Sequence, residues 1–416
     1  MKITDKVRSL KSSLLEKGQE RKRLKRAAQL QFAIADSLNM LNTEVWKNLT
    51  HQCSFFMSAD YLKAMEPVLP TNISPRYALI YQENDGVLQP IAAVYVHIID
   101  IHLAHARPEQ KAMSLWKKPV HLLSKKVSQR VLTCGNLLTY GQHGIAFAEG
   151  IDPKIVWHGV AEVLYRLRQA DRLRGKTQFL MIKDLHAPFT EHALHLSRLN
   201  YRYLETEPNM VLTLGQDWKS YDDYLASLSS KYRANIRNGV LKPIDEADCV
   251  IEQAADLTSL QDQFFTLYQS VQANAAFRPF LLRTEYFSAL QRVAGERFRC
   301  SLIKRNHTLL GFLISVADGD TSIAYHIGFD RSAAAELPLY FRLLHAGIAD
   351  ALALGCKRIS FGRSALEPKA ALGAKPETFG VLVRHRQPIL NTLLKRLLLG
   401  IEHEEAPDRN PFKKVS

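Results

Sequence analysis

One order of expected elements occurs twice along this chain: a hairpin, a strand, a helix that ends at glycine, and another strand. In the first half the hairpin turns at Asn84-Asp85-Gly86, and a helix opened by Asp152-Pro153 ends before Gly175. In the second half the hairpin turns at Asn306-His307, and a helix from Pro338 ends near Gly355, before the strand KRISFG. The repeat predicts two similar α/β units in tandem, and 416 residues suffice for two domains of roughly 150 to 200 residues.

Basic residues are concentrated at the N-terminus. The chain has a net charge of +14, and residues 1–26 carry ten Lys/Arg against three Asp/Glu, so half of the excess lies there. Ile3, Val7, Leu10 and Leu14 recur at helical spacing, which predicts a basic amphipathic helix. Three interpretations remain open: a solvated helix docked on its own domain, contact with an anionic membrane, or contact with the phosphates of RNA, including a tRNA.

Composition also bears on the compartment. No apolar run reaches the roughly 18 residues of a membrane helix, and the N-terminus lacks the apolar core and cleavage site of a signal peptide. The five cysteines are widely separated and form no C-x-x-C pair, which argues against a disulfide framework and a cysteine-based zinc site. We therefore expect a cytoplasmic protein with free thiols, and peripheral contact with the inner face of the membrane as a further possibility.

One histidine-rich stretch, VHIIDIHLAHA, invites a metal site because it contains His97, Asp100, His102 and His105. In a strand His97 points away from Asp100 and His102, and no thiolate or further carboxylate is obvious nearby, so we predict no metal here. The chain also has no Gly-x-Ser-x-Gly, Walker or dinucleotide-binding glycine pattern at a strand-to-helix turn. Hydrolase, NTPase and Rossmann functions therefore have no support.

Four stretches in the second half carry a resemblance: SLSSKYRANIRN, AYHIGFD, the helix end LALGCKRISFG and the loop RSALEPKAALGA. Together with the terminal RNPFK they resemble the FemAB-like branch of the GNAT acyltransferase superfamily, over about residues 55–415. The resemblance implies two GNAT-like folds in tandem, with an acyl-transfer cleft between the strands TSIAYHIGFD and KRISFG. It also implies direct attack of an amine on the acyl carbonyl, with a backbone N–H of the first strand stabilising the oxyanion.

The chain departs from acetyl-CoA-dependent GNAT enzymes at one loop. Those enzymes bind the pyrophosphate with a glycine-rich loop at a helix N-terminus, whereas Asp330–Pro338 contains no glycine. FemAB-like proteins also lack that loop. The donor therefore stays open among acyl-CoA, acyl carrier protein and aminoacyl-tRNA, and no permanently bound cofactor is expected.

Tyr325 and His326 are the candidate catalytic residues on the first cleft strand. On a regular strand adjacent side chains point to opposite faces, so only one of the two would line the cleft. His326 is a candidate general base and Tyr325 a candidate donor to the leaving group, with packing roles as the alternative. Tyr340 and His345, on the helix that flanks the cleft, are candidate donor- or substrate-binding residues, with core packing or surface roles as the alternative.

Charged residues supply the other candidate binding groups. Lys231, Arg233 and Arg237 follow a helical apolar stripe and are expected to clamp the phosphates of a donor or an anionic acceptor, unless they form a solvated helix face. Loops after the strands of α/β folds often collect functional groups, and an exposed Arg–Glu ion pair is the alternative there. The loop after KRISFG contributes Gly362, Arg363, Glu367 and Lys369.

The sequence thus predicts an α/β fold of two tandem GNAT-like units with central mixed sheets flanked by helices. We expect a basic helical arm at 1–40, units at 41–215 and 216–380, and an amphipathic helix with a tail at 381–416. The predicted activity is N-acyl transfer from acyl-CoA or acyl carrier protein to an amine acceptor, which could be linked to lipid or the cell envelope. The alternatives are an aminoacyl-tRNA-dependent transferase of the peptidoglycan type, and a non-catalytic protein that binds an anionic membrane or RNA.

Overall fold

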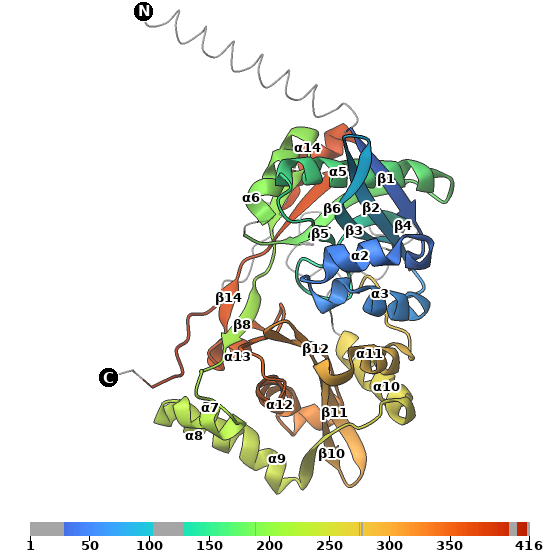
Figure 1. Cartoon of the computed structure of the whole chain (residues 1–416). Coiled ribbons are helices and arrows are strands. Elements are labelled where there is room, and N and C mark those ends of the chain that lie inside the picture. The colour runs from blue at the N-terminus through green and yellow to red at the C-terminus, as the bar shows by residue number, and fades with distance from the viewer. Residues whose placement is uncertain are drawn as a thin grey trace, which may run out of the picture.

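Two α/β units lie one above the other in the computed structural model, each built on a mixed sheet flanked by helices (Figure 1). The structure describes residues 29–102, 128–187, 189–273, 275, 278–398 and 406–413. The predicted fold class is therefore confirmed. The basic arm at residues 1–26 lies outside the described residues.

The first sheet has the strand order β1-β2-β3-β4-β6-β15-β7, with β5 paired to β3 beside this path. Its strands are β1 (Leu30–Ala35), β2 (Ile73–Asn84), β3 (Val87–His102), β4 (Ser128–Cys134), β5 (Ile145–Phe147), β6 (Thr177–Leu185), β7 (Arg202–Glu205) and β15 (Gly380–His385). The second sheet has the order β14-β8-β13-β12-β11-β10-β9. Its strands are β8 (Asn209–Thr213), β9 (Cys249–Gln253), β10 (Phe298–Arg305), β11 (Thr308–Asp318), β12 (Thr321–Phe329), β13 (Arg358–Ser360) and β14 (Lys375–Glu377). One pair of neighbours is parallel in each sheet, β4 with β6 and β12 with β13.

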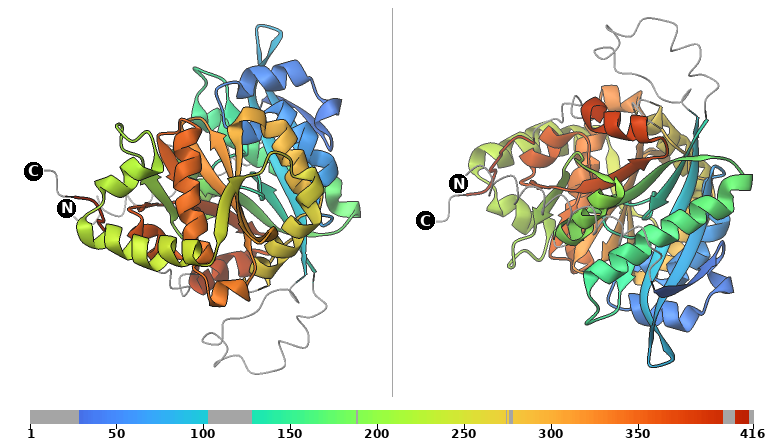
Figure 2. Two further views of the ribbon diagram at one scale, coloured as in Figure 1. Left: turned by 90° about the horizontal axis from the view of Figure 1, so that it is seen from below. Right: turned by 90° about the horizontal axis from the view of Figure 1, so that it is seen from above.

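The helices form three layers around the sheets. Figure 2 shows α5 across the outer face of the first sheet, and Figure 1 shows α3, α10 and α11 between the units and α12 against the second sheet. The described helices are α2 (Thr43–Thr50), α3 (Ala59–Met65), α5 (Pro153–Ala170), α6 (Phe189–Ala193), α7 (Tyr221–Ser227), α8 (Ser230–Ile236), α9 (Lys242–Glu246), α10 (Gln261–Gln272), α11 (Tyr286–Ala294), α12 (Leu339–Ala353), α13 (Leu366–Ala371) and α14 (Pro388–Leu398). A π-helical turn, Arg237–Leu241, joins α8 to α9.

The two units exchange one strand each. β8 follows β7 in sequence but pairs with β13 and β14 of the second sheet, and β15 follows β14 but pairs with β6 and β7 of the first. A cut between residues 215 and 216 therefore does not separate the sheets, because each sheet contains a strand from the other half of the chain.

One hydrophobic core is shared by both units. It contains Tyr77 and Tyr95 of the first sheet, Phe312 and Ile323 of the second, and Tyr286 of α11 between them. A second core packs α5 and α6 on the outer face of the first sheet, and two more pack α12 on the far face of the second. Burial of apolar surface thus stabilises the contact between the units as it stabilises each unit.

Local signals account for the repeated order. The turn residues Asp85 and Asn306 have φ of 51° and 49°, in the left-handed region that Asp and Asn tolerate better than most residues. The Asp152 carboxylate accepts a hydrogen bond from the Lys154 N–H at 2.9 Å and so caps α5 at the predicted position. Gly355, with φ of 69°, follows the end of α12 as expected.

Three segments differ from the sequence-based expectation. Leu30–Ala35, expected in the arm, form β1 because they pair with β2. The helix expected after residue 216 is broken between α7 and α8, where Leu228 is fully buried and bridges to Phe412. The C-terminal helix begins only at Pro388, because Gly380–His385 pair with β6 and β7.

Candidate active site

The parallel strands of the second sheet separate as predicted. β12 pairs with β13 only at Thr321–Ile323 with Arg358–Ser360. β12 then continues through Phe329 against β11 alone, and among the described residues no hydrogen bond joins this part of β12 to the residues after β13. The backbone N–H and C=O groups on that edge of β12 are therefore not used in a ladder with β13. We call this opening the second fork.

The strand β12 carries a bulge at the second fork. Ile314 of β11 pairs with His326 and Ser315 pairs with Ala324, so Tyr325 is the extra residue. The prediction that Tyr325 and His326 point to opposite faces is wrong, because the bulge interrupts the alternation and their ring centroids lie 4.2 Å apart. Such a bulge re-aims side chains and backbone groups beside the opening.

Tyr325 and His326 are packed inside an aromatic cluster. The Tyr325 hydroxyl shares hydrogen bonds with the hydroxyls of Tyr286 at 2.8 Å and Tyr61 at 3.4 Å. Asn136 Nδ2 donates to the Tyr61 hydroxyl at 3.3 Å, so this buried polar chain links the two units. Burial raises the pKa of Tyr325 well above its usual value and lowers the pKa of His326 to about 3. At neutral pH both side chains are therefore uncharged.

The loop between β12 and α12 binds its own carboxylate. Asp330 Oδ1 accepts hydrogen bonds from the N–H groups of Ser332 at 2.8 Å and Ala333 at 3.2 Å, and from the Ser332 hydroxyl at 2.5 Å. These hydrogen bonds lower the pKa of Asp330, so the carboxylate is ionised at neutral pH. These two amides are therefore already engaged, which is a physical difference from the loop that holds a pyrophosphate in acetyl-CoA enzymes.

Tyr340 and His345 lie on α12 in different surroundings. Tyr340 is partly buried near Phe329, with ring centroids 6.1 Å apart, and burial raises its pKa to about 12. His345 is 2% exposed and shares a 2.9 Å hydrogen bond with the hydroxyl of Tyr221 in α7. Burial lowers the pKa of His345 to about 3, and its contacts are those of a core residue.

The three candidate cations lie on α8 and at the first residue of the π-helical turn that follows it. Lys231 and Arg237 are exposed, Arg233 is partly exposed, and the structure gives these three side chains no hydrogen bond or ion pair with another described residue. Arg237 begins the π-helical turn, which packs against α12. Such turns are frequent at functional sites.

The loop after β13 is used for contacts within the protein. Lys369 is 3% exposed, and its Nζ donates to the carbonyl oxygens of Gly362, Arg363 and Ser364 at 3.1, 2.9 and 2.7 Å. Burial lowers the pKa of Lys369 to about 7. Arg363 forms an ion pair with Asp184 of the first unit, whereas the exposed Glu367 pairs with Arg409. The alternative of an Arg363–Glu367 pair is therefore wrong.

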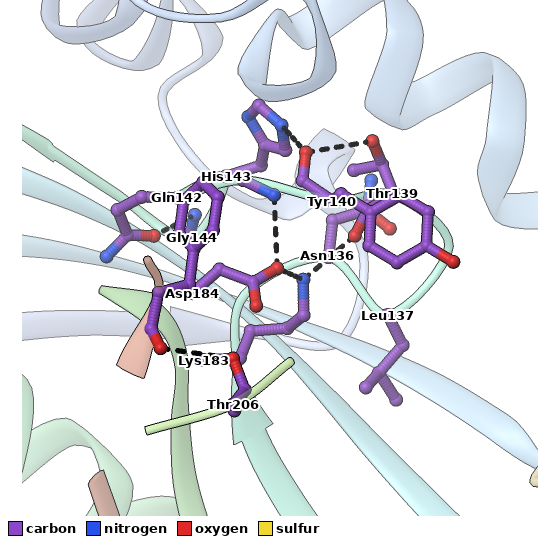
Figure 3. A network of polar contacts seen from close by, with 12 residues as sticks. Asn136, Leu137, Thr139, Tyr140, Gln142, His143, Gly144, Lys183, Asp184 and Thr206 are labelled. Atoms are coloured by element: carbon purple, nitrogen blue, oxygen red, sulfur yellow. Dashed lines mark hydrogen bonds and ion pairs between the residues drawn. The ribbon is translucent and has the colours of Figure 1, made fainter. Parts of the chain in front are cut away.

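The corresponding fork of the first sheet is closed. β4 pairs with β6 up to Cys134, and the loop of residues 135–144 then turns back over the end of β6. The Lys183 Nζ donates to the Thr139 carbonyl at 2.8 Å and forms an ion pair with Asp184, which also accepts from the Gly141 N–H at 3.0 Å (Figure 3). A Cβ on Gly135 would lie 2.5 Å from Lys183 Cγ, so this space is filled.

A cleft of about 520 Å³ lies between the units, next to the second fork. Its lining includes Thr321 and Ile323 of β12, Arg358 and Ser360 of β13, and the loop of residues 140–143 of the first unit. Three lining side chains have a buried atom with no hydrogen-bond partner among the described residues: Gln142 Nε2, His143 Nδ1 and His186 Nδ1. Buried polar atoms usually have a hydrogen-bond partner, and these three are available to polar groups that enter the cleft.

The sequence did not identify several residues of this region as functional. Lys183 and Asp184 lie near the end of β6 and His143 lies in the loop after β4, and the sequence assigned none of the three a role. Tyr61 and Tyr286 come from helices far apart in the sequence. The one sequence signal for this polar cluster was the adjacent Lys183 and Asp184 near the end of an otherwise apolar strand.

The described residues contain no group of three or more His, Cys, Asp or Glu side chains arranged to hold a metal. In the stretch considered for a metal, His97 is fully buried against Tyr95, and Asp100 pairs with Arg130 at 2.8 Å. None of the helices in the described part of the chain is long and apolar enough to span a membrane.

Comparisons with known proteins give a match to one domain and likenesses to solved structures at low identity. Residues 230–370 match the model of the acetyltransferase (GNAT) domain. No curated protein matches the chain. Among solved structures, FemX is 12% identical with a TM-score of 0.48, covering 86% of this chain and 98% of its own. A tandem GNAT protein from the clavulanic acid biosynthesis pathway is 11% identical with a TM-score of 0.49, covering 86% and 99%. A GCN5-related N-acetyltransferase from Anabaena variabilis is 12% identical with a TM-score of 0.40, covering 87% and 74%.

The family match spans α8, α12 and the two strands that border the second fork, β12 and β13. The predicted resemblance to GNAT acyltransferases is therefore confirmed for residues 230–370, which match a GNAT acetyltransferase domain in the second half of the chain.

Proposed function

We propose that the protein is an N-acyltransferase that moves an acyl group from a thioester, acyl-CoA or acyl carrier protein, to an amine at the second fork. The observation that carries the proposal is the end of β12–β13 pairing at Ile323, followed by the bulge at Tyr325. A strand edge without a ladder partner offers backbone donors to an acyl carbonyl and to the oxyanion formed on attack.

The donor is proposed to lie on the α12 side of the second fork. Tyr232 and Leu241 share a core with Tyr340 of α12, and the π-helical turn packs against α12, so these cations are carried on elements that pack on the α12 side of the second sheet. Because Asp330 engages the amides of its loop, we propose that Lys231, Arg233 and Arg237 bind the donor phosphates through their side chains.

The acceptor amine is proposed to enter through the cleft on the opposite face. Thr321, Ile323 and Ser360 form its floor where β12 and β13 diverge, so an amine there and a carbonyl beyond the fork would meet between the strands. The unpartnered atoms of Gln142, His143 and His186 would bind polar groups of the acceptor. An acceptor linked to lipid or the cell envelope is part of this proposal.

His143 is the group proposed to take the ammonium proton. Its Nε2 lies 2.7 Å from the Tyr140 carbonyl oxygen and donates to it in the neutral ring, which leaves the Nδ1 lone pair without a partner. Burial lowers the pKa of His143, so the ring is neutral near pH 7. His326, whose pKa is about 3 and whose ring packs against Tyr268, Tyr286 and Phe287, is less suited to this role.

Thermal denaturation with each donor tests the proposal. A thioester that binds the folded protein raises the melting temperature with concentration, and roughly 2.7 kcal/mol is gained at a hundredfold excess over Kd. Arg237→Gln should reduce this rise, and Arg292→Gln, an exposed change on α11, should not. Thiol release with amine acceptors then measures transfer, which His143→Gln should slow.

If no acyl-CoA or acyl carrier protein raises the melting temperature but the protein consumes aminoacyl-tRNA, the donor is an aminoacyl ester and not a thioester. That result would also favour the peptidoglycan-type alternative.

A further inference from the structure

A second pocket lies on the first unit, away from the cleft between the units. It encloses about 210 Å³ at the C-terminal end of α5 and the start of β6. Four of its lining residues are basic and none is acidic: Arg168, Arg172, Lys176 and Arg386. Gln169, Gly175 and Thr177 complete the lining.

No carboxylate among the described residues that line this pocket neutralises its positive charge. Asp171, the nearest carboxylate in sequence, is 6% exposed and is already paired with Arg76 at 3.3 Å and Arg130 at 2.9 Å. Burial lowers the pKa of Arg168, and the cations of Arg384 and Arg386 lower it further. Cations near a helix C-terminus interact favourably with the helix dipole, but this accounts only for Arg168 in the last turn of α5 and Arg172 just after it, and not for Lys176 or Arg386.

A buried hydroxyl provides an independent sign of a ligand. Thr177 is 3% exposed and lines the pocket, and its Oγ1 has no hydrogen-bond partner among the described residues. A hydroxyl beside several guanidinium groups suits the oxygens of a phosphate, which accept from both.

Exposed apolar side chains lie close in sequence to residues that line this pocket. Leu173, which directly follows Arg172, is 99% exposed, and Ile389, three residues after Arg386, is 77% exposed. Leu390 and Leu393 of α14 are also exposed. Apolar side chains next to unbalanced cations are the combination that binds the interface of an anionic bilayer, where phosphates meet acyl chains.

We propose that the pocket lined by Arg168, Arg172, Lys176 and Arg386 binds the phosphate of an anionic phospholipid and so docks the first unit on a membrane surface. Leu173 and Ile389 enter the interface beside it. This site is separate from the basic arm at residues 1–26 and from the second fork, and it does not depend on the identity of the acyl donor.

Flotation of the full-length protein with vesicles tests the proposal. We expect binding to vesicles of phosphatidylcholine mixed with phosphatidylglycerol and none to phosphatidylcholine alone. Each cation near an anionic surface contributes about fivefold, so Arg168→Gln/Arg172→Gln/Arg386→Gln should lower the partition coefficient roughly a hundredfold. The matched control Lys154→Gln/Lys242→Gln/Arg292→Gln removes the same charge elsewhere and should lower it less than fivefold. Both variants keep residues 1–26, so the contribution of the arm cancels.

A second measurement separates a lipid phosphate from a soluble one. Leu173→Ser/Ile389→Ser should lower vesicle binding and leave the weak binding of inorganic phosphate, followed by calorimetry, unchanged. Equal losses in the two triple variants would overturn the proposal, because charge alone would explain binding. Binding of inorganic phosphate without vesicle binding, or displacement from vesicles only by RNA, would overturn it as well.

Discussion

Each sheet has one pair of parallel strands, and each pair ends in a fork. The two forks differ in what occupies them. At the first fork the loop of residues 135–144 and the Lys183–Asp184 pair occupy the end of the parallel strands. At the second fork β12 continues past its last partner in β13, and a bulge turns Tyr325 and His326 together. A repeated fold can therefore keep its architecture in both copies while only one copy keeps an opening.

Charged residues of the loop after the second fork also have different roles from those expected of a binding loop. Arg363 follows the second fork, yet its guanidinium completes the polar cluster of the first by pairing with Asp184. The ammonium of Lys369 contacts three carbonyl oxygens of the same loop and so fixes the route of the chain toward that pair. The short segment from Gly362 to Lys369 therefore contributes to the closed first fork and also forms the loop after the second fork.

The largest expected effect is on stability, at the closed fork. Asp184→Ala leaves Lys183 and Arg363 buried without their shared partner, and we expect a loss of about 3–5 kcal/mol in the free energy of unfolding. Urea denaturation measures it. Glu367→Ala, which removes an exposed carboxylate paired with Arg409, is the control and should cost less than about 1 kcal/mol. Similar losses in both variants would contradict the structural role of the closed fork.

At the open fork we expect an effect on activity. Ala324→Phe adds bulk on the α12 side of β12, next to the last strand pair, where we propose that the acyl group lies. Displacement of the donor by about 1 Å should slow thiol release roughly a hundredfold. Ala353→Phe, at an exposed position near the end of α12, should leave the rate unchanged. Full activity of Ala324→Phe would move the reaction away from this fork.

Each fork also has a histidine whose pKa is lowered by burial, fully buried His97 at the first and partly exposed His326 at the second, and a change of pH distinguishes their contributions to stability. His97 is fully buried, and burial together with the Lys183 cation lowers its pKa to about 3. The unfolded chain binds a proton at this residue below about pH 6.5 but the folded chain does not until about pH 3, so stability is lost as pH falls through this window.

Between pH 7.5 and pH 5 His97 should therefore account for about 2 kcal/mol of lost stability, and the partly exposed His326 for less. Denaturation of His97→Gln and His326→Phe at the two pH values measures each share. A loss on acidification that is unchanged in both variants would contradict burial of the neutral rings.

The smallest expected effect concerns donor binding. Arg237→Gln should raise the donor KM about tenfold, which corresponds to about 1.4 kcal/mol, without changing kcat. Lys154→Gln removes an exposed cation from the first unit and should leave the donor KM unchanged. An equal rise in both variants would mean that net charge, and not a site on the second unit, attracts the donor.

The sequence by itself determined the repeated order of elements, because turn residues such as Asn306 and caps such as Asp152 act over a few residues. It also indicated the family through stretches that later proved to surround the second fork. These signals depend on a few neighbouring residues, so they can be recognised in a single sequence without an alignment of relatives.

Only the tertiary structure decided which strand belongs to which sheet and which fork is open. The exchange of β8 and β15 depends on pairings between residues more than 140 positions apart, such as Ser360 with Val211, and no local pattern specifies them. The same holds for Arg363, whose partner Asp184 lies 179 residues away. Burial is a property of the assembled core, and it placed Arg363, a candidate binding residue from the sequence, in an ion pair between the units.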